Sequence, residues 1–368
     1  MRTPLAAASE RVRTAAYYAR GKTGGNDRRG RLIVKAKFLP VILFLFLLAS
    51  TTVCMGKSGT ITYDIKLNAA KGAKNARLWL PYPLSGKHQT ISDIHVSGNY
   101  GNWAVYHDPK SGDTYLYAEW TDIGSRPSLV MSFHAVSENR RIGNLEDSAK
   151  PVPETVEKYL ASSQWLPASD YRRLAAQIVE GKKTYLARVH AVYDWVIEHT
   201  FRDEGVKGCG LGLATRTLTE LKGGGKCADI SSVFVTIARA AGIPARDVFG
   251  LRLADPKSRD ITTAFHCWAQ FYLPGTGWVT ADPADVRKMM LDHHLRLKEA
   301  GKWEKFFWGG DDLFRVALEK DSRGVVFNPP QKGEPLSYFM YPFAQVDGKS
   351  LDYFSPADFS YTVSFKAD

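Results

Sequence analysis

A short glycine run leads into one long apolar helix pattern, and this combination constrains the fold more than any other feature of the chain. The sequence GGGKCADISSVFVTIARAAG runs from Gly223 to Gly242. Apolar residues recur at helical spacing from Ile230 to Ala241, which is typical of a helix that buries one face. Gly242 stands where a C-terminal cap belongs. The sequence therefore predicts an amphipathic helix that begins at Cys227 and packs on a core.

Segments typical of β-strands lie on both sides of this helix. Six of them fall between residues 59 and 138, with the sequences TITYDIKL, ARLWLPY, TISDIHV, WAVYH, TYLYAEW and SLVMSFHAV. Their alternation and the turn formers between them predict an antiparallel, sandwich-like domain over residues 57–140. Three more, RDVFGLRL, AFHCWAQFYL and GWVTAD, follow the helix. We therefore expect an α+β protein in which the helix packs on an antiparallel sheet.

The glycines before Cys227 admit three interpretations. A phosphate-binding loop needs a glycine five residues before its Gly-Lys pair and Ser or Thr after it, but Glu220 and Cys227 occupy these positions. Glycines that end a preceding short helix would explain Gly223 to Gly225. Glycines would also let a substrate approach a cysteine whose thiolate is stabilised by the N-terminus of a helix. The sequence excludes the first interpretation and leaves the other two open.

A histidine and an aspartate downstream complete the pattern of a nucleophilic site. A cysteine that attacks an amide needs an imidazole to exchange its proton and a third group to orient the imidazole. His266 lies on a predicted strand, and Asp282 ends the next one. Strand alternation places Cys267 on the face opposite to His266, packed in the sheet, and Trp268 on the same face. We expect Gly225 and Trp268 to line the substrate cleft.

This part of the chain resembles the core motif of the transglutaminase-like superfamily. The motif's elements are a glycine-preceded cysteine, a helix, the sequence Ala-Gly-Ile-Pro-Ala-Arg, a His-x-Trp strand and a Gly-Trp hairpin that reaches Asp-Pro, and all are present. The resemblance covers about residues 185–285. It implies a papain-like core in which Cys227 is the nucleophile, His266 the general base and acid, and Asp282 the orienting residue.

The resemblance also implies an organisation of the chain into four parts. The N-terminal strand-rich domain, 57–140, follows a leader over residues 1–56. The transglutaminase-like catalytic domain spans 141–310, and a C-terminal β segment, 311–368, is expected to complete the catalytic sheet.

The implied activity is that of a thiol-dependent amide hydrolase, similar to cysteine peptidases, that acts on a protein or peptide through a thioester. The first alternative is a protein-glutamine γ-glutamyltransferase, which passes the acyl group to an amine. The second alternative is a non-catalytic binding module on the same fold. The second oxyanion-hole donor is not assigned, because neither Trp165 nor Trp195 lies in a matching motif.

The remaining thiols and histidines do not form a metal-binding motif. Beyond the leader the cysteines are Cys209, Cys227 and Cys267, an odd number that leaves at least one thiol free unless it pairs between chains. These residues, with His293 and His294, lack C-x-x-C or H-x-x-x-H spacing. We expect neither a metal nor a cofactor.

The first 56 residues have the composition of an export signal. They carry a net charge of +8 out of +11 for the chain, so the rest is nearly balanced and a nucleic-acid partner is not expected. The uncharged run 38–56 follows the basic part. This order predicts export to the periplasm or the extracellular space, through a signal peptide or a membrane anchor. We expect membrane contact only through this segment.

Overall fold

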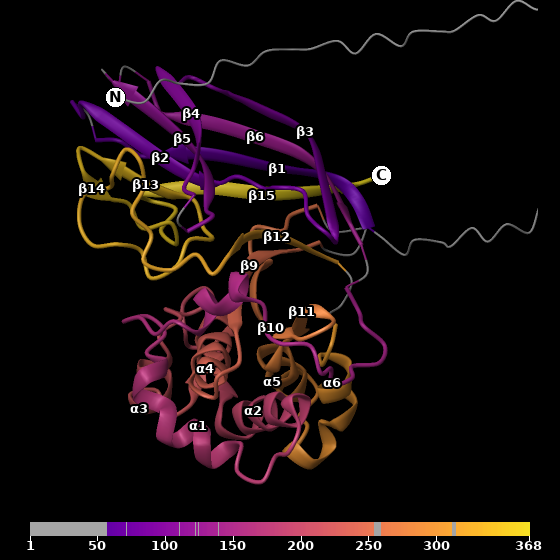
Figure 1. Ribbon diagram of the computed structural model, residues 1–368. Coiled ribbons are helices and arrows are strands. Elements are labelled where there is room, and N and C mark those ends of the chain that lie inside the picture. The colour runs from indigo at the N-terminus through magenta and orange to yellow at the C-terminus, as the bar shows by residue number, and fades with distance from the viewer. Residues whose placement is uncertain are drawn as a thin grey trace, which may run out of the picture. The chain divides into compact units, whose positions relative to one another are not determined.

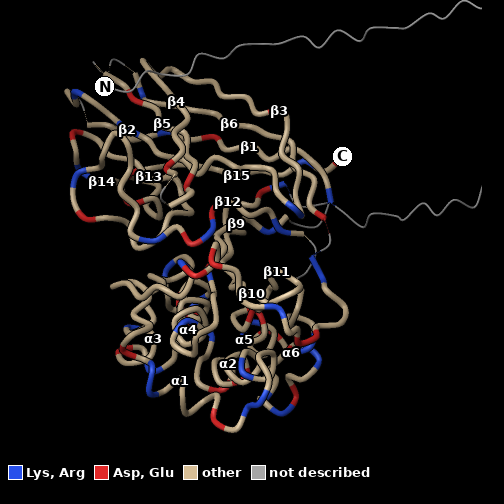
Figure 2. The backbone as a smooth tube through the Cα atoms, viewed as in Figure 1, with Lys and Arg blue, Asp and Glu red and all other residues tan. Residues whose placement is uncertain are grey.

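The structure is a computed structural model that describes residues 57–368 except for 71, 110, 122, 124, 139, 254–258 and 311–313. The predicted leader therefore lies outside the described residues. None of the helices in the described part of the chain is long and apolar enough to cross a membrane. Basic and acidic residues are interspersed along the described chain (Figure 2), as expected from its balanced charge.

Two antiparallel sheets form the strand-rich part of the protein (Figure 1). The first has the order β15-β1-β6-β3, with β15 (Phe359–Ala367), β1 (Lys57–Leu67), β6 (Ser128–Ser137) and β3 (Gln89–Gly98). The second has the order β14-β13-β2-β5-β4, with β14 (Lys349–Ser350), β13 (Phe343–Val346), β2 (Asn75–Pro81), β5 (Thr114–Thr121) and β4 (Asn102–His107). Alternating side chains of the two sheets, such as Ile61 on β1 and Leu116 on β5, share one hydrophobic core. All six predicted N-terminal strands are confirmed.

The second part of the protein is a small sheet with helices packed on it. The sheet has the order β11-β10-β9-β12, with β11 (Gly277–Ala281), β10 (Phe265–Leu273), β9 (Ala245–Arg252) and β12 (Arg315–Lys320), all antiparallel. Helix α4 (Cys227–Ala240) packs on β9 and β10. Around α4 lie α1 (Arg172–Ile178), α2 (Tyr185–His199), α3 (Ala214–Thr219) and α5 (Pro283–Asp292), and α6 (Gly301–Phe306) contacts α5.

Three 3-10 helices and a short strand pair complete the described elements. The 3-10 helices are η1 (Glu154–Leu160), η2 (Ala168–Tyr171) and η3 (Leu297–Glu299), and β7 (Phe201–Arg202) pairs in parallel with β8 (Gly224–Gly225).

Helix α4 forms the centre of this part because nearly all of its side chains are buried. It begins at Cys227 and is followed by Gly242 with φ of 77°, a left-handed conformation that favours glycine after a helix end. The two predicted ends of this helix are confirmed, but the prediction that it buries one face is wrong, because nearly all of its side chains are buried. A helix buried on every side, as α4 is, is held by packing rather than by its intrinsic propensity.

The expectation that residues 311–368 complete the catalytic sheet is correct only for β12, which pairs with β9. Strands β13, β14 and β15 join the two sheets of the strand-rich part instead. Strand β15 pairs with β1, and its burial pattern suits that place, because Phe359, Val363 and Phe365 are buried while the residues beside them are partly or fully exposed. Such a strand fits the edge of a sheet that covers one core face.

Strand β12 is also hydrogen-bonded to the strand-rich part. The Gln89 side chain donates to the carbonyl of Ala317 and accepts from its N–H, both at 2.8 Å. Ser137 Oγ donates to the carbonyl of Arg315 at 2.7 Å. The backbone of Arg315 is thereby fixed from the sandwich side.

Candidate active site

The N-terminus of α4 places Cys227 at the wall of a cavity. The helix start is held by Asp229, whose carboxylate accepts from the N–H of Lys226 at 3.2 Å and from the N–H of Gly212 at 2.9 Å. The Cys227 side chain is almost fully buried, yet it lines a cavity of about 660 Å³. A cysteine in the first turn of a helix faces the positive end of the helix dipole, which stabilises a thiolate.

The structure explains the glycine at position 225 differently from the sequence analysis. Gly225 is buried and is not among the residues that line the cavity. A Cβ at this position would lie 2.5 Å from the Cβ of Asp229, a contact that real side chains do not make. Gly225 is therefore needed for the close packing of the β8 backbone against the helix start, rather than for the approach of a substrate.

His266 and Asp282 form a buried hydrogen-bonded pair. His266 on β10 lies 2.8 Å from Asp282, measured from Nε2 to Oδ2, and both side chains are buried. Asp282 is the N-cap of α5, where its Oδ1 accepts from the N–H of Asp285 at 2.9 Å. Because Nε2 faces the carboxylate, Nδ1 is the nitrogen left to serve the thiol of Cys227. The structure brings the three predicted residues to one site.

Three charged residues that the sequence analysis missed surround this pair. Arg315 on β12 donates from Nη1 to Asp282 Oδ2 at 2.6 Å and from Nη2 to Asp285 Oδ2 at 2.7 Å. Arg252 on β9 donates to the other oxygen of Asp285. The carboxylate of Asp285 also lies 3.6 Å from His266 Nε2. The sequence held no signal for this network, because Arg315 and Arg252 lie on strands whose pattern indicates packing only.

The network sets the protonation states of the site. Burial and Arg252 lower the pKa of His266, but the carboxylates of Asp285 and Asp282 outweigh them and raise it above its ordinary value of 6.5. The pKa of Cys227 is well below its ordinary value of 9.0, first because of the adjacent thiol of Cys209, then because of Cys267 and the nearby His266. Between these two pKa values the site holds a thiolate and an imidazolium.

Trp268 lies on the His266 face of β10, but it does not line the cavity as expected. It is buried, and its ring stacks on the His266 imidazole with 5.9 Å between centroids. The Arg315 guanidinium lies 5.3 Å from the same ring. Trp268 therefore packs against the imidazole from outside the cavity lining. Cys267 is buried, as predicted, and its thiol faces Met340 Sδ at 3.7 Å.

The cavity is lined by basic and aromatic side chains. The basic ones are Arg202, Lys226, Arg252 and Lys288, and the aromatic ones are Phe265, Tyr341, Tyr353, Phe354, Phe359 and Tyr361. No Asp or Glu of the described chain is among the lining residues. Two of the aromatic residues belong to β15, so the C-terminal strand of the sandwich contributes a wall of the site.

The two tryptophans considered as oxyanion donors lie elsewhere. Trp195 stacks on His199 with 4.3 Å between ring centroids, and Trp165 packs against Gly324 and lines a different cavity. Neither is among the residues that line the cavity of Cys227.

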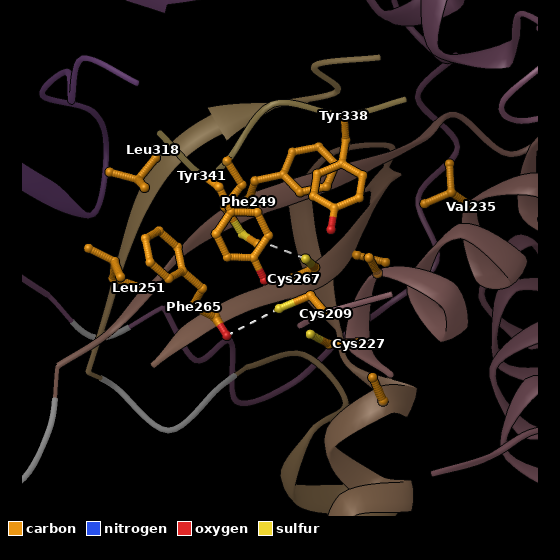
Figure 3. Close-up of a cluster of buried hydrophobic side chains, with 14 of the residues drawn as sticks. Cys209, Cys227, Val235, Phe249, Leu251, Phe265, Cys267, Leu318, Tyr338 and Tyr341 are labelled. Atoms are coloured by element: carbon orange, nitrogen blue, oxygen red, sulfur yellow. Dashed lines mark hydrogen bonds between the residues drawn. The ribbon is translucent and has the colours of Figure 1, made fainter. Parts of the chain in front are cut away.

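Three thiols that are far apart in the sequence meet beside the helix start. The Sγ atoms of Cys209, Cys227 and Cys267 all lie within 4.8 Å of one another, and none is in a disulfide (Figure 3). His293 stacks on Trp303 instead of joining them. Sequence spacing could not reveal this cluster, because a loop, a helix and a strand each supply one thiol. The expected absence of a metal stays a prediction.

We expect Cys227 to react with iodoacetamide at mildly acidic pH much faster than Cys209 or Cys267. The physical reason is that a thiolate is the reactive form, and only Cys227 has a lowered pKa among the three. Replacement of His266 with Ala should shift the labelling profile toward that of a free thiol near pKa ~8.5. The measurement is peptide mass spectrometry of the labelled cysteines against pH. Equal rates at the three cysteines would contradict the ion pair.

Comparison with known proteins places this site in a family context. A family model described as the transglutaminase-like superfamily matches residues 172–283. An uncharacterized protein of Haemophilus influenzae is 32% identical over 330 residues, which cover 82% of this chain and 89% of that protein. The uncharacterized protein YebA of Bacillus subtilis is 27% identical over 244 residues, which cover 57% of this chain and 33% of YebA.

One solved structure is similar over most of its length. The crystal structure of a candidate cysteine protease from Cytophaga hutchinsonii matches 84% of this chain and 98% of its own, with a TM-score of 0.52 and 16% sequence identity. This likeness concerns the fold alone.

Proposed function

Because the chain belongs to the transglutaminase-like superfamily, we propose that it is a thiol-dependent amide hydrolase that acts on proteins or peptides. The observation that carries this proposal is the juxtaposition of Cys227, at a helix N-terminus, with the buried His266–Asp282 pair. A nucleophile, a base with a raised pKa and a carboxylate that orients it are what amide cleavage through a thioester requires.

In the proposed reaction, the thiolate of Cys227 attacks the carbonyl carbon of an amide. The carbonyl oxygen becomes an oxyanion, to which the backbone N–H of Cys227 in the first turn of α4 would donate. The imidazolium of His266 then gives its Nδ1 proton to the departing amine, and a thioester remains on Cys227. Neutral His266 next takes a proton from water, which attacks the thioester and releases the acid and the thiolate.

The charged surroundings suit this sequence of protonation states. Asp282 accepts the Nε2–H of His266 and so stabilises the imidazolium that donates to the leaving group. Arg315 donates one hydrogen bond to Asp282 and one to Asp285, and these bonds fix both carboxylates relative to the imidazole. The imidazolium therefore has two carboxylates beside it, Asp282 at 2.8 Å and Asp285 at 3.6 Å from Nε2.

The alternative function is transfer of the acyl group to an amine. Transfer requires a site that shields the thioester from water and binds the amine. His266 and Asp282 are separated by only 16 residues, so the chain between them has little length from which to build such a shield. We therefore propose hydrolysis as the main outcome.

A glutamine-containing peptide incubated with a fluorescent primary amine should yield mainly the free acid. The measurement is chromatography of the peptide products with mass detection, with Cys227→Ala as the matched control that should form neither product. A dominant amine adduct at millimolar amine, absent in the control, would contradict hydrolysis and favour transglutamination.

We also propose that the protein is exported, on the basis of its basic, then uncharged, N-terminal segment. A fusion of residues 1–60 to alkaline phosphatase should be active, because this enzyme folds only after export to an oxidising compartment. The control is the same fusion with charged residues placed in the 38–56 run. An inactive fusion in export-competent cells would overturn the proposal.

A further inference from the structure

Three thiols meet at the start of α4, and the proposed mechanism uses only that of Cys227. A second one, Cys209, lies in the same cavity as this nucleophile. Both Cys209 and Cys227 line the cavity, whereas Cys267 does not. Their Sγ atoms lie within 4.8 Å of one another, and the carbonyl of Cys209 accepts from the N–H of Ala228 at 2.9 Å. The backbone of Cys209 thus lies directly beside that of the nucleophile.

The loop of Cys209 is held in place on both sides. Gly210 has φ of 92°, and a Cβ there would lie 1.8 Å from the carboxylate of Asp229. The carbonyl of Gly210 accepts from Tyr338 Oη at 2.7 Å. The Cys209 thiol itself donates weakly to the carbonyl of Phe265 at 3.4 Å. A disulfide forms only between thiols whose side chains can approach each other, and the two Sγ atoms already lie within 4.8 Å of one another.

From this geometry we propose that Cys227 and Cys209 form a peroxide-sensing pair, in which Cys209 resolves the oxidised nucleophile into a reversible disulfide. The substrate of this second chemistry is a hydroperoxide small enough to enter the cavity. The proposal needs a reactive thiolate at Cys227, which the proposed hydrolase function also needs, but it does not require amide cleavage.

The two steps balance with hydrogen peroxide as the oxidant. The thiolate of Cys227 attacks one peroxide oxygen, the O–O bond breaks, and Cys227 becomes a sulfenic acid while the hydroxide that leaves takes up a proton as water. The thiol of Cys209 then attacks the sulfenic sulfur, the S–S bond forms and the S–O bond breaks. The departing hydroxide takes the Cys209 proton, so two thiols and one peroxide give one disulfide and two waters.

The roles of the two thiols are not interchangeable. The adjacent Cys227 and burial raise the pKa of Cys209, and the thiol of Cys209 faces the carbonyl of Phe265, so Cys209 keeps its proton while Cys227 is the thiolate that meets the peroxide. Cys267 lies on the paired strand β10, with its thiol toward Met340 and outside the cavity lining. Cys209 is therefore the resolving thiol, and its disulfide would protect Cys227 from irreversible oxidation to sulfinic acid.

The test treats the full chain with about a tenfold molar excess of hydrogen peroxide, because a thiol consumes two peroxides on its way to sulfinic acid. Free thiols are then alkylated in denaturant and the cysteines are mapped by mass spectrometry. We expect a Cys209–Cys227 peptide pair in the wild type and full recovery of Cys227 labelling after dithiothreitol. In Cys209→Ala, sulfinic acid should replace the disulfide, and recoverable Cys227 labelling should fall by at least ~10-fold. Cys267→Ala is the matched control and should still form the Cys209–Cys227 bond.

Cys209→Ser provides a second variant in case the alanine variant does not fold, and thermal unfolding checks both. Sulfinic acid at Cys227 in the wild type without the Cys209–Cys227 bond would overturn the proposal. A bond between Cys209 and Cys267, or recovery in Cys209→Ala equal to wild type, would overturn it as well. Because the readout is thiol chemistry and not amide turnover, its failure is distinguishable from failure of the hydrolase function.

Discussion

Replacement of Cys227 with alanine is expected to lower the turnover of peptide amides by at least ~10⁴-fold, the scale seen when a nucleophile is removed from a triad. The side chain is small and sits at the cavity wall, so we expect its loss to change the free energy of unfolding by only about 1 kcal/mol. The measurement is kcat/KM for a peptide amide together with urea unfolding of the same preparation.

Cys267→Ala is the matched control for this substitution. Its thiol is buried in the same cluster but faces Met340 and does not line the cavity. It should therefore lose far less turnover than Cys227→Ala at a comparable cost in stability. Equal turnover in wild type and Cys227→Ala would contradict the assignment of the nucleophile and favour a binding module on the same fold.

Replacement of Arg315 with methionine is expected to destabilise the protein by about 3–5 kcal/mol, because it leaves buried carboxylates without their cation. Arg315 is completely buried and joins Asp282 and Asp285 through two short hydrogen bonds. Urea unfolding at neutral pH measures the loss. Methionine keeps most of the side-chain volume, so the effect reports the charge more than a cavity.

The pH dependence of this loss follows from the pKa of Asp285. Burial raises this pKa, but Arg252, His266 and Arg315 together lower it below its ordinary value of 3.8. A lowered folded-state pKa contributes stability above the unfolded value, and this stability is lost as the pH falls through the folded value. The difference between wild type and Arg315→Met should therefore be largest at neutral pH and shrink as the pH falls below about 4.

The same substitution should raise the pKa of His266, because Arg315 lowers the pKa of that imidazole in the wild type. His266 has a raised folded-state pKa, so its contribution to stability is present below pH 6.5 and is lost as the pH rises through the folded value. In Arg315→Met, the contribution of His266 to stability should be lost at a higher pH than in the wild type. The alkaline end of the iodoacetamide labelling profile of Cys227 should shift to higher pH as well.

Arg323→Met is the control for the effect of a buried charge as such. Arg323 pairs with buried Asp247 at 2.6 Å and lines a different cavity. It should destabilise the protein comparably without a shift in the labelling profile of Cys227. Identical shifts in both variants, or a loss below about 1 kcal/mol for Arg315→Met, would contradict the role assigned to Arg315.

Local patterns in the sequence were sufficient to predict the elements and to single out three candidate residues that the structure brings together. The helical spacing from Ile230 to Ala241 predicted α4, and strand alternation predicted that Trp268 shares a face with His266. Each of these inferences depends on residues a few positions apart, for which the backbone geometry is nearly fixed.

Features that depend on tertiary pairing could not be predicted in the same way. The sequence of β15 is that of an ordinary half-buried strand. Only its pairing with β1 shows that it belongs to the strand-rich part and not to the sheet that contains β10. Arg315 reaches Asp282 across 33 residues, and the Cys209 thiol meets Cys227 through a loop held by Asp229. Trp268 was placed on the correct face, but whether that face opens to the cavity depends on the arginines that cover it.

The central claim is that Cys227 carries the acyl group, and trapping the thioester tests it most directly. A panel of peptide amides is mixed with the enzyme, quenched with acid within a turnover and digested for mass spectrometry. We predict the acyl mass on the Cys227 peptide, lost on hydroxylamine treatment, and its absence in Cys227→Ala. Amide cleavage without an adduct at Cys227, or an adduct that forms instead on another residue, would contradict the account.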